Sequence, residues 1–176
     1  VCPHATIRPF VMNAEEAKKA PKSTKLTAVK AMKGFEDYKF TMAISPLDCM
    51  GCGLCVNVCP VAIKAKANGT PEKTAIRMVP QAIQLDQQDV FDYAVASVTK
   101  KELPFAEFSV KGSQFNQPLL EFSGSCAGCA ETSYARLITQ LFGERMYISN
   151  ATGCSSIWGG SAPATPYTVN KESGRG

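Results

Sequence analysis

The spacing of apolar and polar residues along this chain predicts several short elements of a small α+β protein. Residues 7–12 and 39–44 are predicted strands, and 39–44 alternates moderately between apolar and polar positions. From Gln87 to Lys100 the apolar residues recur at helical spacing, which predicts a helix. A second helix is predicted from Thr132 to Phe142 and ends at Gly143. Residues 145–149 are a predicted strand.

Three stretches lack such periodicity. The step from Cys2 to Cys49 is long for the cysteine arrangement described below, so residues 13–37 are interpreted as an insertion. Residues 68–71 are predicted to turn, and residues 101–120 carry Pro, Gly and Asn breaks typical of a linker. We therefore expect two units, at 1–110 and 111–176.

The strongest chemical signal is a group of four cysteines followed by a proline, at the spacing C-x2-C-x2-C-x3-C-P. They are Cys49, Cys52, Cys55 and Cys59. This spacing is the bacterial ferredoxin signature for a 4Fe-4S cluster, in which three thiolates bind one cluster and the fourth binds a second. Gly51 and Gly53 permit backbone conformations that turn N–H groups toward cluster sulfurs.

The chain opens Val1-Cys2-Pro3, and Cys-Pro is how such a motif ends. Cys2 is therefore interpreted as the last cysteine of an earlier motif, and the crossover rule pairs it with Cys49, Cys52 and Cys55 in one complete ligand set. Cys59 then serves a cluster whose other ligands precede residue 1. On this interpretation the chain is a segment of a larger protein.

Other readings of the cysteines and of the charge are weaker. A disulfide framework does not need the ferredoxin spacing, and a cysteine at x3 has no obvious zinc role. The net charge of +4 comes from residues 1–40, which hold eight Lys or Arg against four Asp or Glu. The basic stretch 17–25 has no aromatic residue and no binding motif for nucleic acid. A solvated flexible loop is expected there, or else a patch that steers an acidic electron carrier.

A second cysteine group consists of Cys126, Cys129 and Cys154. Cys154 lies in the loop 150–154, beyond the predicted strand, where cofactors bind in α/β folds. Three cysteines brought together by a helix and a strand suit a cluster better than a disulfide, although a fourth ligand is lacking. No apolar run approaches the roughly 18 residues of a membrane span.

At these residues the chain resembles the pyruvate:ferredoxin (flavodoxin) oxidoreductase family. The resemblance is carried by the second ferredoxin motif, by CAGCAETSYARLITQLFG at 126–143 and by ISNATGCSSIWGGSAPATPYT at 148–168. The run SSIWGGSAP at 155–163 discriminates the single-chain pyruvate enzymes. The resemblance implies a two-4Fe-4S ferredoxin-like domain, followed by the beginning of an α/β thiamine-diphosphate-binding domain.

The resemblance also implies ligands and cofactors. Cys126, Cys129 and Cys154 hold the cluster nearest thiamine, with a fourth cysteine far downstream. Glu131, Thr152 and Cys154 lie against thiamine diphosphate, which is bound with Mg²⁺. Ala130 and Ser133 depart from the family's usual Gly and Pro, which puts only the loop geometry in doubt.

The activity implied is oxidative decarboxylation of pyruvate to acetyl-coenzyme A, with three clusters relaying electrons to ferredoxin or flavodoxin. The implied partners are the remainder of a homodimeric, cytoplasmic enzyme, with no nucleic acid and no membrane. A Gly-Asp-Gly magnesium–diphosphate motif is absent from the sequence, so the chain alone is expected to be inactive. The alternatives are a stand-alone ferredoxin-type module without thiamine chemistry, or a remnant without clusters.

The remaining polar and aromatic residues suggest less. His4, the single histidine, has no motif-spaced partner and is interpreted as a packing or surface residue. Trp158 either lines a pocket or packs in the core. Arg136 and Arg145 are interpreted as surface charges.

Overall fold

The computed structural model describes residues 2–29, 33–70, 74–161 and 163–176. In chain order the elements are β1 (Ile7–Met12), α1 (Ala14–Lys19), β2 (Thr27–Ala28), β3 (Lys39–Ile44), α2 (Leu54–Asn57), α3 (Pro60–Ala67), η1 (Gln81–Gln84), α4 (Asp86–Ser97), α5 (Val110–Ser113), α6 (Ala130–Phe142), η2 (Gly143–Arg145), α7 (Cys154–Ser156) and the π-helical turn η3 (Ile157–Ser161). Within these ranges, none of the helices combines the length and apolar character needed to cross a membrane.

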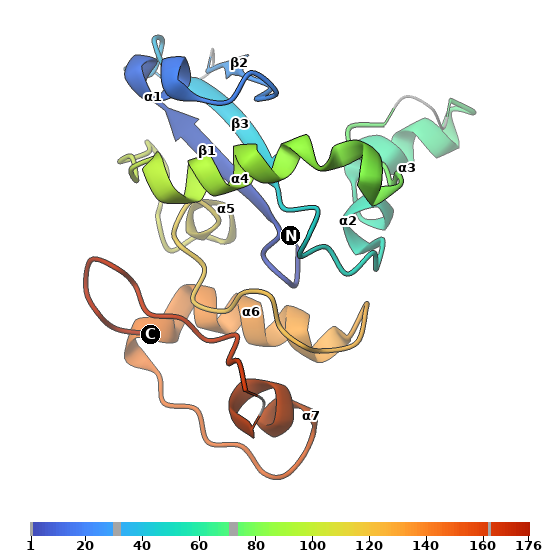
Figure 1. Cartoon of the computed structure of the whole chain (residues 1–176), viewed down its shortest axis with the longest axis vertical. Helices are drawn as coiled ribbons and strands as arrows, with labels where there is room; N and C mark the ends of the chain where they lie inside the picture. Colours follow the sequence, from blue (N-terminus) through green and yellow to red (C-terminus); the bar gives the residue numbers. More distant parts are fainter. Residues whose placement is uncertain (1, 30–32, 71–73, 162) are drawn as a thin grey trace.

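A small antiparallel sheet organises the N-terminal half. The strand order is β1-β3-β2, with Ile7 opposite Ile44 and Met12 opposite Lys39. Helix α4 lies across β1 and β3 (Figure 1). Val90, Phe91 and Ala94 of α4 pack against Met12 and Ala43 to form the core. The predicted strands at 7–12 and 39–44 are thus confirmed, as is the helix predicted at 87–100, which ends at Ser97.

The insertion at 13–37 is partly ordered by a helix. Asn13 and Glu16 form a capping box that starts α1, in which each side chain accepts a hydrogen bond from the other residue's backbone amide. Lys18 and Lys19 are exposed at the end of α1, and residues 30–32 of the insertion lie outside the described residues. The first part of the stretch expected to be a flexible loop is therefore helical.

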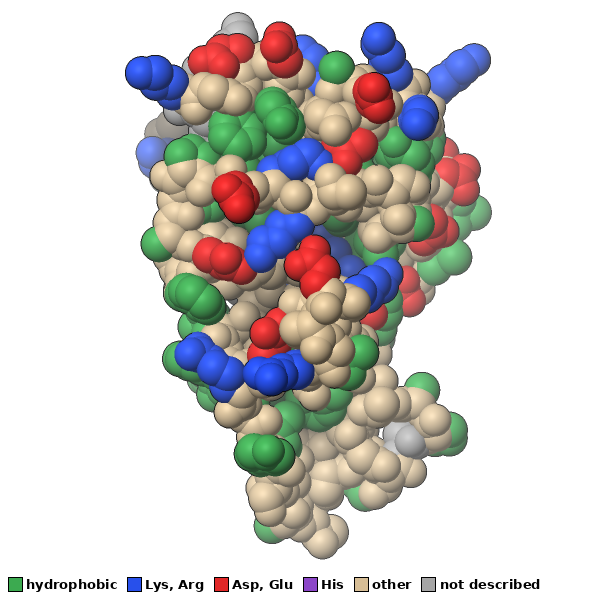
Figure 2. Space-filling model, turned by 90° about the vertical axis from the view of Figure 1, so that its left-hand side faces the viewer, with side chains coloured by type: hydrophobic (Ala, Val, Ile, Leu, Met, Phe, Trp, Pro, Cys, Tyr) green, Lys and Arg blue, Asp and Glu red, His purple; other side chains and the backbone are tan. Residues whose placement is uncertain are grey.

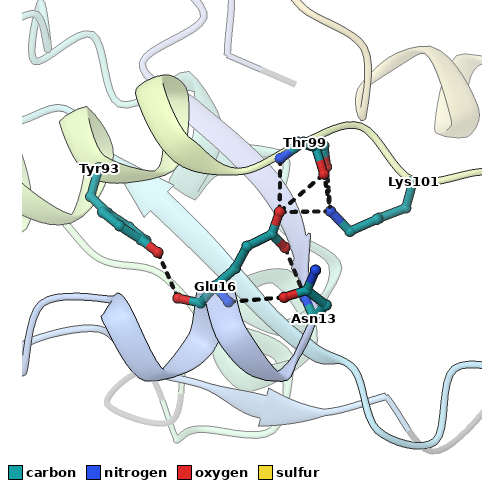
Figure 3. A network of polar contacts seen from close by, with 5 residues as sticks. All are labelled: Asn13, Glu16, Tyr93, Thr99 and Lys101. Carbon is teal, nitrogen blue, oxygen red and sulfur yellow. Dashed lines mark hydrogen bonds and ion pairs between the residues drawn. The ribbon is translucent and has the colours of Figure 1, made fainter.

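Glu16 also ties the insertion to the segment after α4 (Figure 3). Its carboxylate accepts hydrogen bonds from the Thr99 backbone amide and hydroxyl and from Lys101 Nζ, which lies 2.9 Å away. Tyr93 of α4 donates its hydroxyl to the Glu16 carbonyl. Burial alone would raise the pKa of Glu16, but the hydrogen bonds from Lys101, Thr99 and Asn13 outweigh it and leave the pKa lowered.

The stretch 101–120 is structured as well. It contains α5, and Leu119 and Leu120 are buried near its end. It leads into a close contact between the two halves of the chain, where the Phe122 amide donates to the His4 carbonyl at 3.0 Å. Arg8 pairs with Glu121 and lies over the rings of Phe91 and Phe122. The expected linker is thus packed against both halves, and the domain boundary at 110/111 falls at the start of α5.

Helix α6 is amphipathic, and its polar face is the one that is buried. Thr132, Arg136 and Thr139 lie at i, i+4 and i+7 and are at most 4% exposed. The apolar residues Tyr134, Ile138 and Phe142 occupy the opposite face and are exposed. The interpretation of Arg136 as a surface charge is therefore wrong, whereas Arg145 is exposed. The sequence pattern located the helix but not which of its faces packs inward.

The strand predicted at 145–149 is not formed. Residues 146–150 have no regular structure, and Tyr147 is fully exposed. A strand needs a neighbour that accepts and donates its backbone hydrogen bonds. Among the described residues the sheet consists of β1, β3 and β2, and none of them pairs with this segment.

The Glu16 network makes stability depend on pH. Because the pKa of Glu16 is lowered in the folded state, its contribution is present above the unfolded pKa and is lost as the pH falls through the folded one. We expect Glu16→Gln to reduce the free energy of unfolding at pH 7 by about 1–3 kcal/mol, because Lys101 then lacks its charged partner. Glu15→Gln, on the exposed side of the same helix, is the control. In urea denaturation, the free energy of unfolding of Glu16→Gln should fall below that of the unsubstituted chain at pH 7 but not at pH 3.

Candidate iron–sulfur centres

The ferredoxin motif forms a loop followed by two short helices. Gly51 and Gly53 adopt φ values of +67° and +71°, which other residues resist, and Gly53 caps α2. Cys55 lies on α2, and Cys59 is the N-cap of α3, whose first residue is Pro60. The expectation that these two glycines take special conformations is confirmed, and the segment at 60–63 is the first turn of α3.

Cys2 belongs to the same neighbourhood, although it is far away in sequence. It is 8% exposed, and its Sγ lies 3.2 Å from the hydroxyl of Thr6. Burial raises the pKa of Cys55, and negative charge on the sulfurs of Cys2, Cys49 and Cys52 raises it further. Charge on any of these three sulfurs therefore acts on Cys55, as the grouping given by the crossover rule expects.

The described residues contain no set of three His, Cys, Asp or Glu side chains close enough to hold a single metal ion. A 4Fe-4S cluster makes a different demand, because each of its four thiolates binds a different iron of the cube. Cys49, Cys52 and Cys55 on the glycine-containing loop, with Cys2 from the N-terminal segment, are the four thiols expected to hold that group. Cluster ligation by Cys2, Cys49, Cys52, Cys55 and Cys59 remains a prediction.

Two cysteines of the second group, Cys126 and Cys129, immediately precede α6. The Cys129 amide donates to the Cys126 carbonyl at 3.0 Å, so the two residues are joined by a tight turn, and Gly128 within it has φ +78°. A Cβ at Gly128 would lie 4.0 Å from the Cβ of Cys52. Cys154 is the first residue of α7 and is exposed. The turn at 126–129 thus lies against the ferredoxin loop.

The N-terminus of α6 favours a thiolate at Cys129. The backbone amides of Thr132 and Glu131 lower the pKa of Cys129 by hydrogen bonding to its sulfur, against a smaller opposing effect of burial. Metal ligation needs the deprotonated sulfur, so this environment suits a ligand. Ligation by Cys126, Cys129 and Cys154 is likewise a prediction.

The residues expected at thiamine are all solvent-accessible. Glu131, Thr152 and Cys154 are all exposed. Burial raises the pKa of Tyr167, and the negative charge of Glu131 adds to this effect. Trp158 is 5% exposed and stacks on Tyr167 with ring centroids 6.2 Å apart. Trp158 is therefore a core residue of this region.

A chain of buried hydroxyl groups connects the two cysteine regions. His4 Nδ1 lies 3.0 Å from Ser123 Oγ, which lies 3.0 Å from Ser125 Oγ. Ser125 Oγ is in turn 2.5 Å from Thr132 Oγ1 on α6. All four side chains are at most 5% exposed, and burial lowers the pKa of His4. We call this set the hydroxyl chain; it confirms the interpretation of His4 as a packing residue.

Sequence reasoning missed the hydroxyl chain and the burial of Arg136. A signal was present, because Thr132, Arg136 and Thr139 share one helical face, opposite the apolar one. Two small hydroxyl residues flanking an arginine on one face are compatible with a packed polar surface. That this face is buried is shown only by the segments that contact it, with Ser125 against Thr132 and Gln114 against Arg136.

The different environments of Cys129 and Cys55 predict different reactivities. In the cluster-free chain, the lowered pKa of Cys129 leaves more thiolate at pH 7 than at an ordinary thiol, and the raised pKa of Cys55 leaves less. We expect iodoacetamide to modify Cys129 several times faster than Cys55 at pH 7, as measured by mass spectrometry. Glu131→Gln should accelerate Cys129 further, because it removes a nearby negative charge. Equal rates at both cysteines would contradict the assignment.

Comparison with known proteins covers both cysteine regions. Residues 1–63 match the 4Fe-4S dicluster domain family. The chain is 54% identical to a pyruvate-flavodoxin oxidoreductase of Klebsiella pneumoniae, and the match covers 97% of this chain and 13% of that protein. It is 49% identical to a pyruvate:ferredoxin oxidoreductase of Moorella thermoacetica, over 98% of this chain and 14% of that protein.

A third relative carries a different name. The chain is 46% identical to a pyruvate dehydrogenase (NADP+) of Cryptosporidium parvum, over 98% of this chain and 8% of that protein. The chain therefore spans between 8% and 14% of the length of these curated relatives. By its similarity over nearly its whole length, it belongs with the pyruvate:ferredoxin and pyruvate-flavodoxin oxidoreductases, of which it matches one stretch that begins with a 4Fe-4S dicluster domain.

Proposed function

We propose that this chain is the electron-relay segment of an enzyme that oxidatively decarboxylates pyruvate to acetyl-coenzyme A. The observation that carries the proposal is the match to pyruvate oxidoreductases, which runs through both cysteine regions rather than through the ferredoxin motif alone. Because the chain spans a small part of these relatives, the substrate chemistry belongs to a longer protein. The relay ends on ferredoxin or flavodoxin, the acceptors in the relatives' names.

The structure supports a relay because the two cysteine regions adjoin. Gly128, between Cys126 and Cys129, packs toward Cys52 of the ferredoxin loop. The hydroxyl chain and the Arg8–Glu121 ion pair hold the segments that carry these loops in one arrangement. Clusters bound at these two places would be neighbours, as electron transfer between them requires.

Thiamine diphosphate with Mg²⁺ is the proposed organic cofactor of the longer protein. When bound, it supplies an electron sink for loss of carbon dioxide from a 2-oxo acid. Glu131 lies in the first turn of α6 and is exposed, as a residue that contacts a cofactor held by another segment would be. The exposed apolar face of α6 and the unpaired segment 145–149 support a further protein layer covering this side.

The names of the relatives indicate that this segment does not decide which electron acceptor is used. Proteins named for flavodoxin, for ferredoxin and for NADP+ all share it at 46–54% identity. The choice of acceptor is therefore assigned to another part of the protein. On the face shown in Figure 2, acidic and basic side chains are interspersed, so that face has no patch of one sign to steer a charged carrier.

We place the enzyme in the reducing cytoplasm, as a homodimer.

A second candidate is a stand-alone ferredoxin-type electron carrier. It is favoured by the dicluster-domain match, which ends at residue 63 and does not include the second cysteine region. In that case the residues after 63 would form a docking surface, and Glu131 would have no cofactor to contact.

Substitution of Glu131 separates these two functions. In the full-length protein, Glu131→Gln should weaken thiamine diphosphate binding at least tenfold, measured by calorimetry, because a carboxylate at the cofactor is lost. Glu144→Gln, an exposed carboxylate beyond the other end of α6, is the control. An unchanged affinity in Glu131→Gln would favour the electron carrier. The isolated 176-residue chain should show no pyruvate decarboxylation in either case.

A further inference from the structure

Helix α6 contributes a positive charge to the interior of the protein. Arg136 is 4% exposed, and its Nη1 donates to Gln114 Oε1 at 3.0 Å. Its Nε is buried and has no hydrogen-bond partner. Among the described residues, no carboxylate lies within ion-pair distance of this guanidinium. A neutral amide is thus the single polar partner found for the side chain.

An unpaired buried guanidinium is unfavourable. Arginine cannot be deprotonated in a protein, so it cannot escape the desolvation penalty by becoming neutral. That penalty is several kcal/mol for a buried ion, and a single hydrogen bond to an amide does not offset it. Burial of Arg136 therefore implies an anion nearby that stabilises the charge.

The charged groups near Arg136 indicate which anion stabilises it. Glu121 is paired with Arg8, a second buried arginine, which repels Arg136. Burial lowers the pKa of Arg136, and negative charge on the Cys2 sulfur opposes that effect, which favours the Cys2 side of α6 as the place of the anion. The hydroxyl chain supports this placement, because it runs from Thr132, one helical turn before Arg136, to His4, two residues after Cys2.

We infer that Arg136 is the buried counter-charge of the 4Fe-4S cluster ligated by Cys2, and that it raises that cluster's reduction potential. A cube held by four thiolates is negatively charged, and reduction adds one electron without forming or breaking a bond. The reduced form is one unit more negative, so a buried cation stabilises it more than the oxidised form. The inference rests on the proposed function, because it requires the cluster to bind.

This role has a consequence for how the two halves of the chain communicate. Arg136 belongs to the helix that begins at Cys129, whereas the cluster it acts on is held by the ferredoxin part. The potential of that cluster thus depends on how α6 docks against residues 2–8. Exposure of the site to water would screen Arg136 and weaken its effect.

The experiment measures the reduction potential in the full-length, anaerobically purified protein by EPR-monitored redox titration. The signal that is lost or altered in Cys2→Ser identifies the relevant cluster. For Arg136→Met we expect the reduced-to-oxidised ratio at a fixed ambient potential to fall at least tenfold, which is about 59 mV for a one-electron couple. Arg136→Lys, which keeps the charge, should shift it less.

A second variant cancels the charge without removing the arginine. Gln114→Glu places a carboxylate where the amide now accepts from Nη1, and should lower the potential in the same direction as Arg136→Met. If the Arg136→Met variant does not assemble its cluster, the potential measured in Gln114→Glu tests the inference in its place. Arg145→Met removes an exposed arginine from the turn after α6 and should leave the potential unchanged.

Two results would overturn the inference. One is an unchanged potential in both Arg136→Met and Gln114→Glu. The other is an equal shift in Arg136→Met and Arg136→Lys, which would indicate a packing effect rather than a charge. Iron and sulfide analysis of the unsubstituted protein tests the proposed function separately, since a lack of clusters there would refute that function and not only the role of Arg136.

Discussion

The docking of the N-terminal loop onto the segment 121–136 is the constraint on which the rest of this structure depends. It joins residues more than one hundred positions apart through buried polar groups: the His4 carbonyl, the hydroxyl chain and the Arg8–Glu121 pair. Buried polar groups are costly unless each finds its partner, so such an interface accepts one arrangement far better than any other. It thereby fixes the distance between the two cysteine regions.

Polar packing at this interface accounts for the orientation of α6. A helix next to an apolar core would turn Tyr134, Ile138 and Phe142 inward. Here the partners are polar, Ser125 for Thr132 and Gln114 for Arg136, so these two residues face inward and the apolar residues remain outside. The two faces of α6 thus suit different neighbours: a charged, hydrogen-bonding interior on one side and an apolar layer on the other.

The relatives place this segment in a wider setting. It is shared by enzymes named for three different electron acceptors, and its similarity extends across both cysteine regions. Under the proposed function, the segment carries electrons between a cofactor on one side and an exchangeable acceptor on the other. Its architecture explains why the interior is polar: the negative charge of clusters needs nearby dipoles and cations, which an apolar core would not supply.

The sequence alone determined the features that depend on local spacing. The cysteine motif, the strands at 7–12 and 39–44 and the helices around 87–97 and 132–142 follow from periodicity and from glycine and proline positions. Tertiary structure decided the rest: which face of α6 is buried, and that 101–120 packs instead of linking. It also decided that 145–149 stays unpaired, because strand formation depends on a neighbour that periodicity cannot reveal. The burial of Arg136 is a tertiary property for the same reason, since it depends on which segment covers the helix.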